Sequence, residues 1–525
     1  MEGTFWAFMP AIIAIVLALV TKQVYVSLFL GIFVGAMMYA GGDPLNALFT
    51  LYQVMSEKVG SNTPIIVFLV VLGILVVLMQ KSGGARAYGD WAGRKIKSKS
   101  GALAATAGLG CLIFVDDYFN CLTVGSVMRP VTDKFKIARS KLAYIIDATA
   151  APVCIIAPIS SWAAAVAGEL EGDGLVVFMS TIPFNVYALL TLVMVFTLCF
   201  INFNFGKMKR NDLIADSTSD VHAGVELDTK EEETVVVNTK GKVRHLLIPV
   251  LILIVCCIGG MLYTGFFYNW DTGLIGKELQ SANFIEAFSN CDAGMSLAIG
   301  STVALVIIAL YYMFAKVVSF KEITGSFTDG FKAMVPAILI LTFAWSISGI
   351  MGSKGGYLDA QAFVENNLVN SNFPKFLFPA IFFIIAGLIA FSTGTSWGTF
   401  GVLVPIAVTI LGGSGTLALL TVSATLGGAV FGDHISPISD TTILASAGAQ
   451  CDHVDHVNTQ LPYATLVAGI SVVAYLIAGA CVNLGSVLTA LITWGVALAL
   501  FAGVVFVIKY LEKRKETSNR SENVK

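Results

Sequence analysis

Long apolar stretches separated by short polar loops make up most of the chain. Residues 376–432 and 457–508 contain no Asp, Glu, Lys or Arg. Apolar runs of about 20 residues are typical of transmembrane helices, because that length crosses the hydrocarbon of a bilayer. The runs are continuous rather than alternating with a period of two, which argues against a β-barrel. The pattern predicts an all-α polytopic membrane protein with about 11–14 hydrophobic segments. The candidates are 5–20, 24–40, 64–80, 101–114, 142–165, 176–201, 246–267, 294–315, 336–352, 376–391, 396–411, 416–432, 462–484 and 487–508.

Composition supports this class of protein. Only 13% of the 525 residues are charged, about half the share of a soluble domain. A net charge of −2 gives no support to nucleic-acid binding. The nine cysteines lie mostly in apolar runs and show no paired spacing, so neither a disulfide framework nor a zinc site is expected. No cofactor is predicted.

Basic loops predict the orientation in the membrane. Lys and Arg gather in residues 81–99, 129–141 and 509–515, which are expected on the cytoplasmic side. The acidic loop at 166–174, which includes Glu169, is expected outside. We therefore predict a multi-pass protein of the cytoplasmic membrane, with its N-terminus outside and its C-terminus inside.

Two similar halves flank a polar segment. Residues 207–245 have the composition of a flexible cytoplasmic linker. Pro-Ile-Ser occurs at 158–160 and again at 437–439, and further matches occur in the same order. We predict a first transmembrane repeat at 1–206, a second at 246–508 and a basic cytoplasmic tail at 509–525. Corresponding loops fall on opposite sides of the membrane, which predicts an inverted-topology repeat.

Several carboxylates interrupt the apolar runs. An unpaired charge in hydrocarbon costs ~3 kcal/mol or more, so these groups are expected to face a cavity, a partner or an ion. Neighbouring Gly, Pro, Ser and Thr predict broken helices, whose freed backbone groups can bind ions. Sodium prefers such oxygen ligands, and a proton can compete with it for a carboxylate. The predicted sodium ligands are Asp116, Asp433 and Asp440. The candidate cation, proton or substrate site comprises Asp116, Asp117, Asn120, Asp147, Ser160, Ser161, Thr393, Thr395, Ser396, Asp433, His434, Ser436, Ser439, Asp440 and Thr441.

Structural roles are alternatives for several of these residues. The pair at 116–117 could cap a helix at the membrane interface, and Asp147 could be an ion-pair partner near the interface. Residues 392–396 could form a helix kink. His453 and His456 are interpreted as solvated loop residues.

Three motifs resemble the NhaC family of sodium/proton antiporters, within the wider ion-transporter superfamily. They are Phe-Val-Asp-Asp-Tyr at 114–118, the segment 147–162 and Gly-Asp-His-Ile-Ser-Pro-Ile-Ser-Asp-Thr-Thr at 432–442. The resemblance covers most of the chain outside the linker and the tail. It implies sodium/proton exchange, a scaffold part and a moving part with re-entrant hairpins. Some relatives are linked to malate, lactate or amino acids.

We predict a secondary active transporter, not an enzyme, that exchanges sodium for protons by alternating access. The alternative is a sodium- or proton-coupled carrier of a small organic acid or amino acid. The expected partners are sodium ions, protons and membrane lipid, with a homodimer left open. An intramembrane aspartyl protease is disfavoured, because Val430 replaces the first Gly of Gly-x-Gly-Asp.

Overall fold

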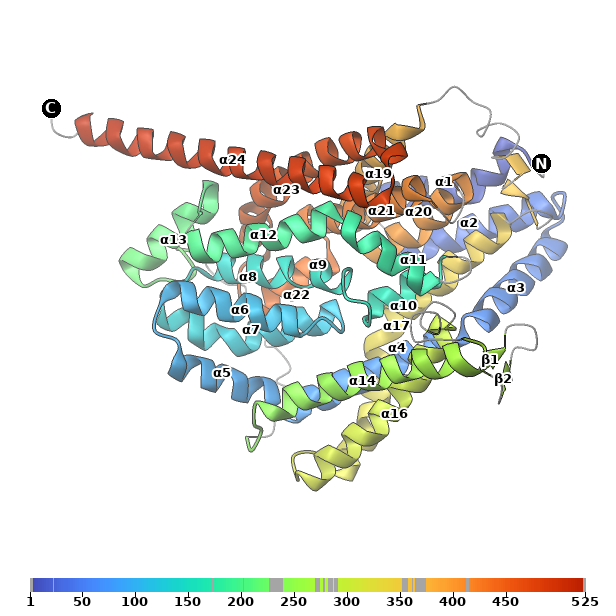
Figure 1. The fold of residues 1–525 in the computed structure, drawn as a ribbon, viewed down its shortest axis with the longest axis horizontal. Helices are drawn as coiled ribbons and strands as arrows, with labels where there is room; N and C mark the ends of the chain where they lie inside the picture. The colour runs from blue at the N-terminus through green and yellow to red at the C-terminus, as the bar shows by residue number, and fades with distance from the viewer. Residues whose placement is uncertain are drawn as a thin grey trace.

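The computed structural model is almost entirely helical (Figure 1). It describes residues 3–21, 23–170, 174–201, 203–225, 239–269, 274–276, 279–281, 287, 291–351, 357–360, 362–363, 374–411 and 415–522. One short antiparallel pair of strands, β1 (Tyr268–Asn269) and β2 (Leu274–Ile275), is the exception to the predicted all-α class. The helices are η1 (Phe5–Phe8), α1 (Met9–Thr21), α2 (Val24–Tyr39), α3 (Pro44–Ser61), α4 (Thr63–Lys81), α5 (Gly84–Lys95), α6 (Lys99–Leu112), α7 (Asp117–Lys134), α8 (Arg139–Ala148), α9 (Ala151–Cys154), α10 (Ser161–Ala167), α11 (Gly174–Thr181), η2 (Ile182–Phe184), α12 (Val186–Ile201), α13 (Gly206–Thr218), α14 (Arg244–Phe267), α16 (Ala293–Phe314), α17 (Phe320–Met351), η3 (Lys375–Leu377), α19 (Phe378–Thr393), α20 (Ser396–Leu411), α21 (Thr416–Ile435), α22 (Asp440–Ala449), α23 (His453–Ala480), η4 (Val482–Leu484) and α24 (Ser486–Glu522).

The apolar helices confirm a multi-pass membrane protein. Within the described residues, eight helices are long and apolar enough to cross a membrane, or up to ten if each bent pair is one span. One bent pair joins α2 to α3 at an angle of 119°. The predicted segments 142–165 and 176–201 are each interrupted, at α8–α10 and at α11–α12, so broken helices are confirmed. The predicted orientation of the termini is not tested by the fold and stays a prediction.

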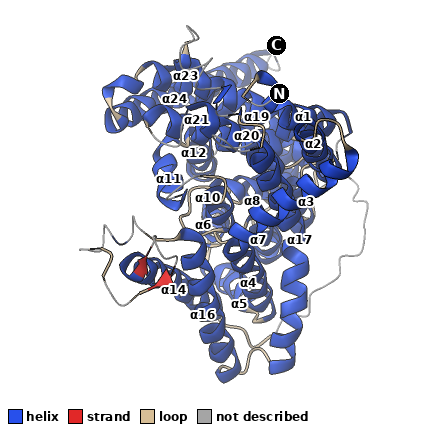
Figure 2. Cartoon of the chain, turned by 90° about the vertical axis from the view of Figure 1, so that its right-hand side faces the viewer, coloured by secondary structure: helices blue, strands red, loops and turns tan. Residues whose placement is uncertain are grey.

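Helix α4 packs against α16 and α17, and α14 packs against α16. Figures 1 and 2 place α14 and α16 at one end of the molecule and α23 and α24 at the opposite end. Backbones approach closely where small residues meet. A Cβ atom at Gly73 of α4 would lie 2.4 Å from the backbone oxygen of Gly330 on α17. Close approach at small residues is how membrane helices gain packing energy without a hydrophobic driving force.

Helices α7 and α22 make a second contact of this kind, between distant parts of the chain. Their first residues lie together, and Gly125 of α7 meets Gly448 of α22 backbone to backbone about two turns further on. The two helices therefore run in parallel. Arg139 Nη1 donates to the carbonyl of Ala449, where the C-terminal end of α22 attracts positive charge.

The start of the predicted flexible linker is an ordered helix, which corrects that prediction for its first residues. Helix α13 docks on the protein through Asp212, whose Oδ2 lies 3.1 Å from Nζ of the fully buried Lys141. A polar composition did not reveal this, because the helix is held by partners more than 70 positions away in the chain. The acidic part of the linker at 226–238 lies outside the described residues.

Candidate ion-binding site at the helix breaks

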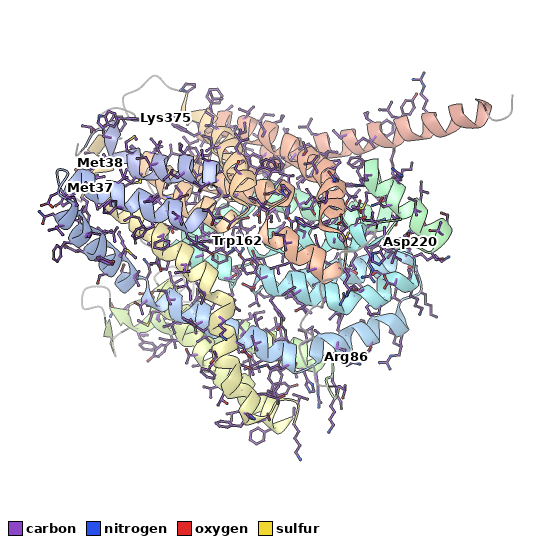
Figure 3. The ribbon with its side chains drawn as sticks, turned by 180° about the vertical axis from the view of Figure 1, so that it is seen from behind. Met37, Met38, Arg86, Trp162, Asp220 and Lys375 are labelled. Atoms are coloured by element: carbon purple, nitrogen blue, oxygen red, sulfur yellow. The ribbon has the colours of Figure 1, made fainter. Side chains whose placement is uncertain are left out.

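Three breaks in the helices bring polar side chains and backbone ends into the interior. Helix α7 begins after the turn at 113–116, α10 begins after 155–160, and α22 begins after 436–439. Each first turn is capped by a buried side chain that accepts from a backbone N–H: Asp116 from Phe119, Ser160 from Ala163, and Ser439 from Thr442. Trp162, in the first turn of α10, lies near the middle of the molecule (Figure 3). The three capping side chains are all buried inside the protein.

Matching hydrogen bonds connect the breaks. The backbone N–H of Ser161 donates to the carbonyl of Val115 over 2.9 Å, and that of Asp440 donates to Gly394 over 3.3 Å. Ser161 and Val115 stand 279 positions before Asp440 and Gly394, respectively. The same offset relates the two capping serines. Such a constant offset is what the predicted repeat requires at this place.

Asp433, near the end of α21, is fully buried among hydroxyl groups. Its Oδ2 accepts from Ser396 Oγ over 2.9 Å and from Thr441 Oγ1 over 3.0 Å. Its Oδ1 has no hydrogen-bond partner among the described residues. The carboxylate is thus anchored on one oxygen and open on the other.

Asp440, at the start of α22, links the two halves of the chain. Its Oδ2 accepts from the hydroxyl of Tyr118 on α7 over 2.7 Å, and its Oδ1 accepts from the backbone N–H of Thr441. Thr441 also donates to Asp433, so these two carboxylates share one neighbour.

Asp117, on α7, is also fully buried. Its Oδ2 accepts from the indole N–H of Trp162 over 2.9 Å. The ring of Trp162 packs at 5.7 Å from that of Trp397, the second residue of α20. Asp116 is the helix cap that the structural alternative proposed, but its burial distinguishes it from an interfacial cap.

Asn120 holds the backbone of this region together. Its Nδ2 donates to the carbonyls of Gly110, Ile113 and Thr149, at 2.7, 2.9 and 3.0 Å. These contacts tie α7 to the end of α6 and to the break after α8. Its Oδ1 is buried and has no hydrogen-bond partner among the described residues, so the amide oxygen stays a candidate ligand for a cation.

Asp147, on α8, is buried and lies beside α23. Its Oδ2 accepts from Gln460 Nε2 over 2.6 Å and from Thr442 Oγ1 over 3.0 Å, and it lies 3.5 Å from Nε2 of His456. Asp147 is therefore fully buried with partners on α22 and α23, and its role as an ion-pair partner near the interface stays a prediction. The interpretation of His456 as a solvated loop residue is wrong, because His456 lies in the first turn of α23 and is fully buried.

The remaining predicted residues contact backbone groups or a tyrosine hydroxyl rather than one another. The hydroxyl of Thr393 donates to Ile389, that of Ser436 donates to Phe391, and Thr395 Oγ1 accepts from the N–H of Gly398 at 3.5 Å. His434 Nδ1 lies 3.0 Å from the hydroxyl of Tyr187. In the part of the chain that the structure describes, no three His, Cys, Asp or Glu side chains are grouped to hold a metal ion. The predicted sodium set of residues 116, 433 and 440 is thus not one three-carboxylate cluster.

Sequence reasoning missed several residues of this site. They are Tyr118, Thr442, His456 and Gln460. Gln460 carried a usable signal, since a glutamine within the uncharged run 457–508 needs a buried partner.

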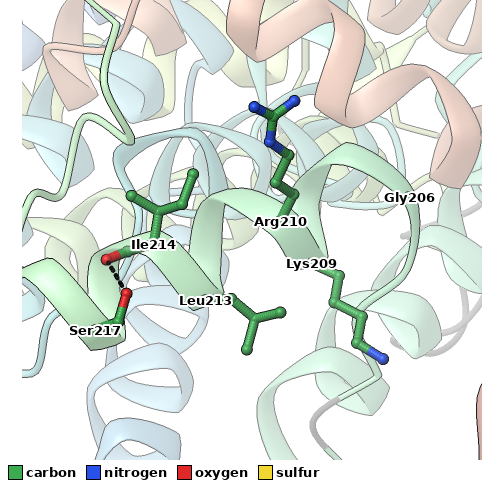
Figure 4. Close-up of a pocket in the computed structure, with 6 residues that line it drawn as sticks. All are labelled: Gly206, Lys209, Arg210, Leu213, Ile214 and Ser217. Atoms are coloured by element: carbon green, nitrogen blue, oxygen red, sulfur yellow. Dashed lines mark hydrogen bonds between the residues drawn. The ribbon is translucent and has the colours of Figure 1, made fainter. Parts of the chain in front are cut away.

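A groove elsewhere shares none of these residues. It follows α13 and is lined by Gly206, Lys209, Arg210, Leu213, Ile214 and Ser217 (Figure 4).

Membrane-spanning helices that break around central carboxylates define the class of secondary transporters. The Na+/H+ antiporter family matches residues 173–480, more than half of the chain. The chain belongs to this family, so the resemblance to sodium/proton antiporters is confirmed.

Individual proteins similar to this chain include two antiporters. An uncharacterized protein of Haemophilus influenzae is 38% identical over 499 residues, 91% of each chain. The malate-2H+/Na+-lactate antiporter of Bacillus subtilis is 32% identical over 149 residues, 27% of this chain and 30% of that protein. The arginine/ornithine antiporter ArcD of Halobacterium salinarum is 40% identical over 115 residues, 21% of this chain and 24% of that protein.

Proposed function

We propose that the protein exchanges sodium ions for protons across the cytoplasmic membrane, with Asp433 as the central ion-binding carboxylate. The geometry around Asp433 carries this proposal. The side chain is fully buried, two hydroxyls from α20 and α22 hold Oδ2, and Oδ1 is without a partner among the described residues. Carboxylate and hydroxyl oxygens suit a hard cation such as sodium.

Exchange follows from competition for one carboxylate. A sodium ion beside Asp433 stabilises the ionised group, and its departure leaves a buried charge that is costly to maintain. A proton then neutralises the group. Because the two ions occupy the carboxylate in turn, each binds after the other has left. Asp440, which shares Thr441 with Asp433, is the proposed second carboxylate of the site.

Alternating access requires that the site open to one side at a time. We propose that residues 1–206 and 246–508 are inverted repeats that exchange conformations. Two backbone hydrogen bonds support this proposal: the bond from Ser161 to Val115 and the bond from Asp440 to Gly394 join residues at corresponding positions, 279 residues apart, in the two halves. Asp440 and Tyr118 belong to different halves, so movement between the halves would alter the site directly.

A second candidate is the coupled transport of a small carboxylate or amino acid. The first turns of α7 and α22 meet at the site, and helix N-termini attract anions. Two relatives that match part of the chain, a malate/lactate and an arginine/ornithine antiporter, also favour it.

Proteoliposomes with an internal pH dye test the first proposal. A sodium chloride pulse, without organic solute, should drive proton movement that potassium chloride does not. Asp433→Asn should abolish it. Asp90→Asn, an equal charge change at an exposed position, should not. Proton movement that requires malate, lactate, arginine or ornithine would favour the second candidate, and undiminished activity of Asp433→Asn would refute the site.

A further inference from the structure

A buried carboxyl group outside the central site is left without partners. Glu169 follows α10 and was expected in an exposed external loop, but only 8% of its surface is exposed. Neither Oε1 nor Oε2 has a hydrogen-bond partner among the described residues. Buried carboxylates without partners are rare and costly, so this one calls for a functional explanation.

We propose that Glu169 is a second proton-binding group of the transporter, separate from the central carboxylates. The inference rests on the proposed sodium/proton exchange. It assigns a proton site on the part of the chain that the sequence places toward the outside.

The surroundings of Glu169 favour a proton over a metal ion. A Cβ atom at Gly401 of α20 would lie 3.9 Å from Oε1 of Glu169 and 2.8 Å from the side chain of Ala344 on α17. The adjacent Gly168 lies against Ile65 of α4 and the indole of Trp345. These neighbours are apolar carbons and an N–H group, whereas sodium needs several oxygen ligands.

The indole N–H of Trp345 is the second unsatisfied group at this place. It is buried and has no partner among the described residues. This N–H lies beside Gly168, the residue before Glu169, so a change of conformation could bring the N–H donor and the carboxyl group together. On one side of this place lie α10 and α20, and on the other lie α4 and α17; we call the boundary between the two pairs the seam. The seam thus contains two buried polar groups without hydrogen-bond partners in the described part of the chain.

Lys58 of α3 is a positively charged group that interacts electrostatically with Glu169. Its stem packs against Gly349, one turn after Trp345 on α17. Lys58 forms no ion pair with Glu169 in the part of the chain that the structure describes. Movement of α10 and α20 along α17 would bring the carboxyl group toward Lys58 or water, where it would release its proton.

Glu169 lies within reach of the central site without being part of it. Helix α10 begins at the site with Ser161 and spans about 10 Å over its seven residues, and Glu169 follows two positions after its last residue, Ala167. A proton on Glu169 can therefore be exchanged with the central carboxylates through a short path when the seam opens.

Glu169→Gln tests the proposal, since it preserves shape and removes the titratable group. In proteoliposomes we expect sodium/sodium exchange, measured with radioactive sodium, within twofold of wild type. Sodium-driven proton movement should fall at least tenfold or lose its pH dependence. The matched control is Glu57→Gln, on the exposed face of α3, which should leave both unchanged. An unaltered rate and pH profile in Glu169→Gln would overturn the proposal.

A labelling experiment keeps the test independent of transport and of the folding of the variant. A hydrophobic carbodiimide reacts with protonated carboxyl groups in apolar surroundings. Peptide mass spectrometry of the wild-type protein should find Glu169 modified, more strongly at lower pH. Absence of modification at every pH would overturn the proposal. A wild-type protein that moves no protons with sodium would instead refute the proposed function, and the labelling would still decide whether Glu169 binds a proton.

Discussion

The buried ion pair between Lys141 and Asp212 gives a sharp test of how α13 is held. Lys141 is fully buried, and its Nζ lies 3.1 Å from Asp212 Oδ2. Asp212 also lies 3.0 Å from Nζ of Lys99. Substitution Asp212→Asn leaves the ammonium group of Lys141 inside the protein without a compensating charge. Removing one partner of a buried pair typically costs about 3–5 kcal/mol. We expect the lower end, because asparagine still accepts a hydrogen bond.

Asp216→Asn is the matched control. Asp216 is on the same helix and bonds the same Lys99 over 2.9 Å, but 52% of its side chain is exposed. Exposed pairs contribute about 0–1 kcal/mol. Heating the detergent-solubilised proteins, followed by size exclusion, should show earlier loss of the monodisperse peak for Asp212→Asn, with faster proteolysis at α13. Equal melting of the two variants would show that α13 is not anchored by this pair.

Two further substitutions test the centre of the protein. Trp162→Phe removes an N–H donor to a buried carboxylate, which should cost about 1.5–3 kcal/mol of binding free energy. The sodium concentration that gives half-maximal exchange should therefore rise at least tenfold. Trp91→Phe, at an exposed position, should leave this concentration unchanged. Gly448→Ala would place its methyl group 2.4 Å from a backbone oxygen of α7, so we expect separation of α7 from α22 and at least tenfold slower exchange. Gly469→Ala, which meets no atom within 4 Å, is its control, and equal transport rates in the two alanine variants would contradict the parallel packing.

Local properties of the sequence were enough to predict a multi-pass membrane protein and the positions at which its helices are interrupted. Apolar runs of about 20 residues determine a membrane-spanning fold, since little else can satisfy their backbone in lipid. Asp433 was predictable as a central residue, because a carboxylate flanked by Gly, Ser and Pro within such a run needs internal partners. The capping serines were predictable for the same reason, as both stand at the end of a Pro-Ile-Ser motif.

The partners of the polar side chains, and whether those side chains are buried, could not be predicted from neighbouring residues in the sequence. Nothing near His456 in the chain indicates that it lies beside Asp147, more than 300 positions earlier. Asp212 was assigned to a flexible segment and Glu169 to an exposed loop, yet both are buried. A polar residue in a short loop has the same local pattern whether the loop faces water or another helix.

The sequence alone therefore determined that this chain crosses the membrane and where its helices break, because hydrophobicity and helix propensity act over neighbouring residues. Only the tertiary structure decided which carboxylates are paired, which are left open and which loops are buried. Those outcomes depend on helix packing, which brings together residues hundreds of positions apart. The properties of a single segment cannot predict such packing.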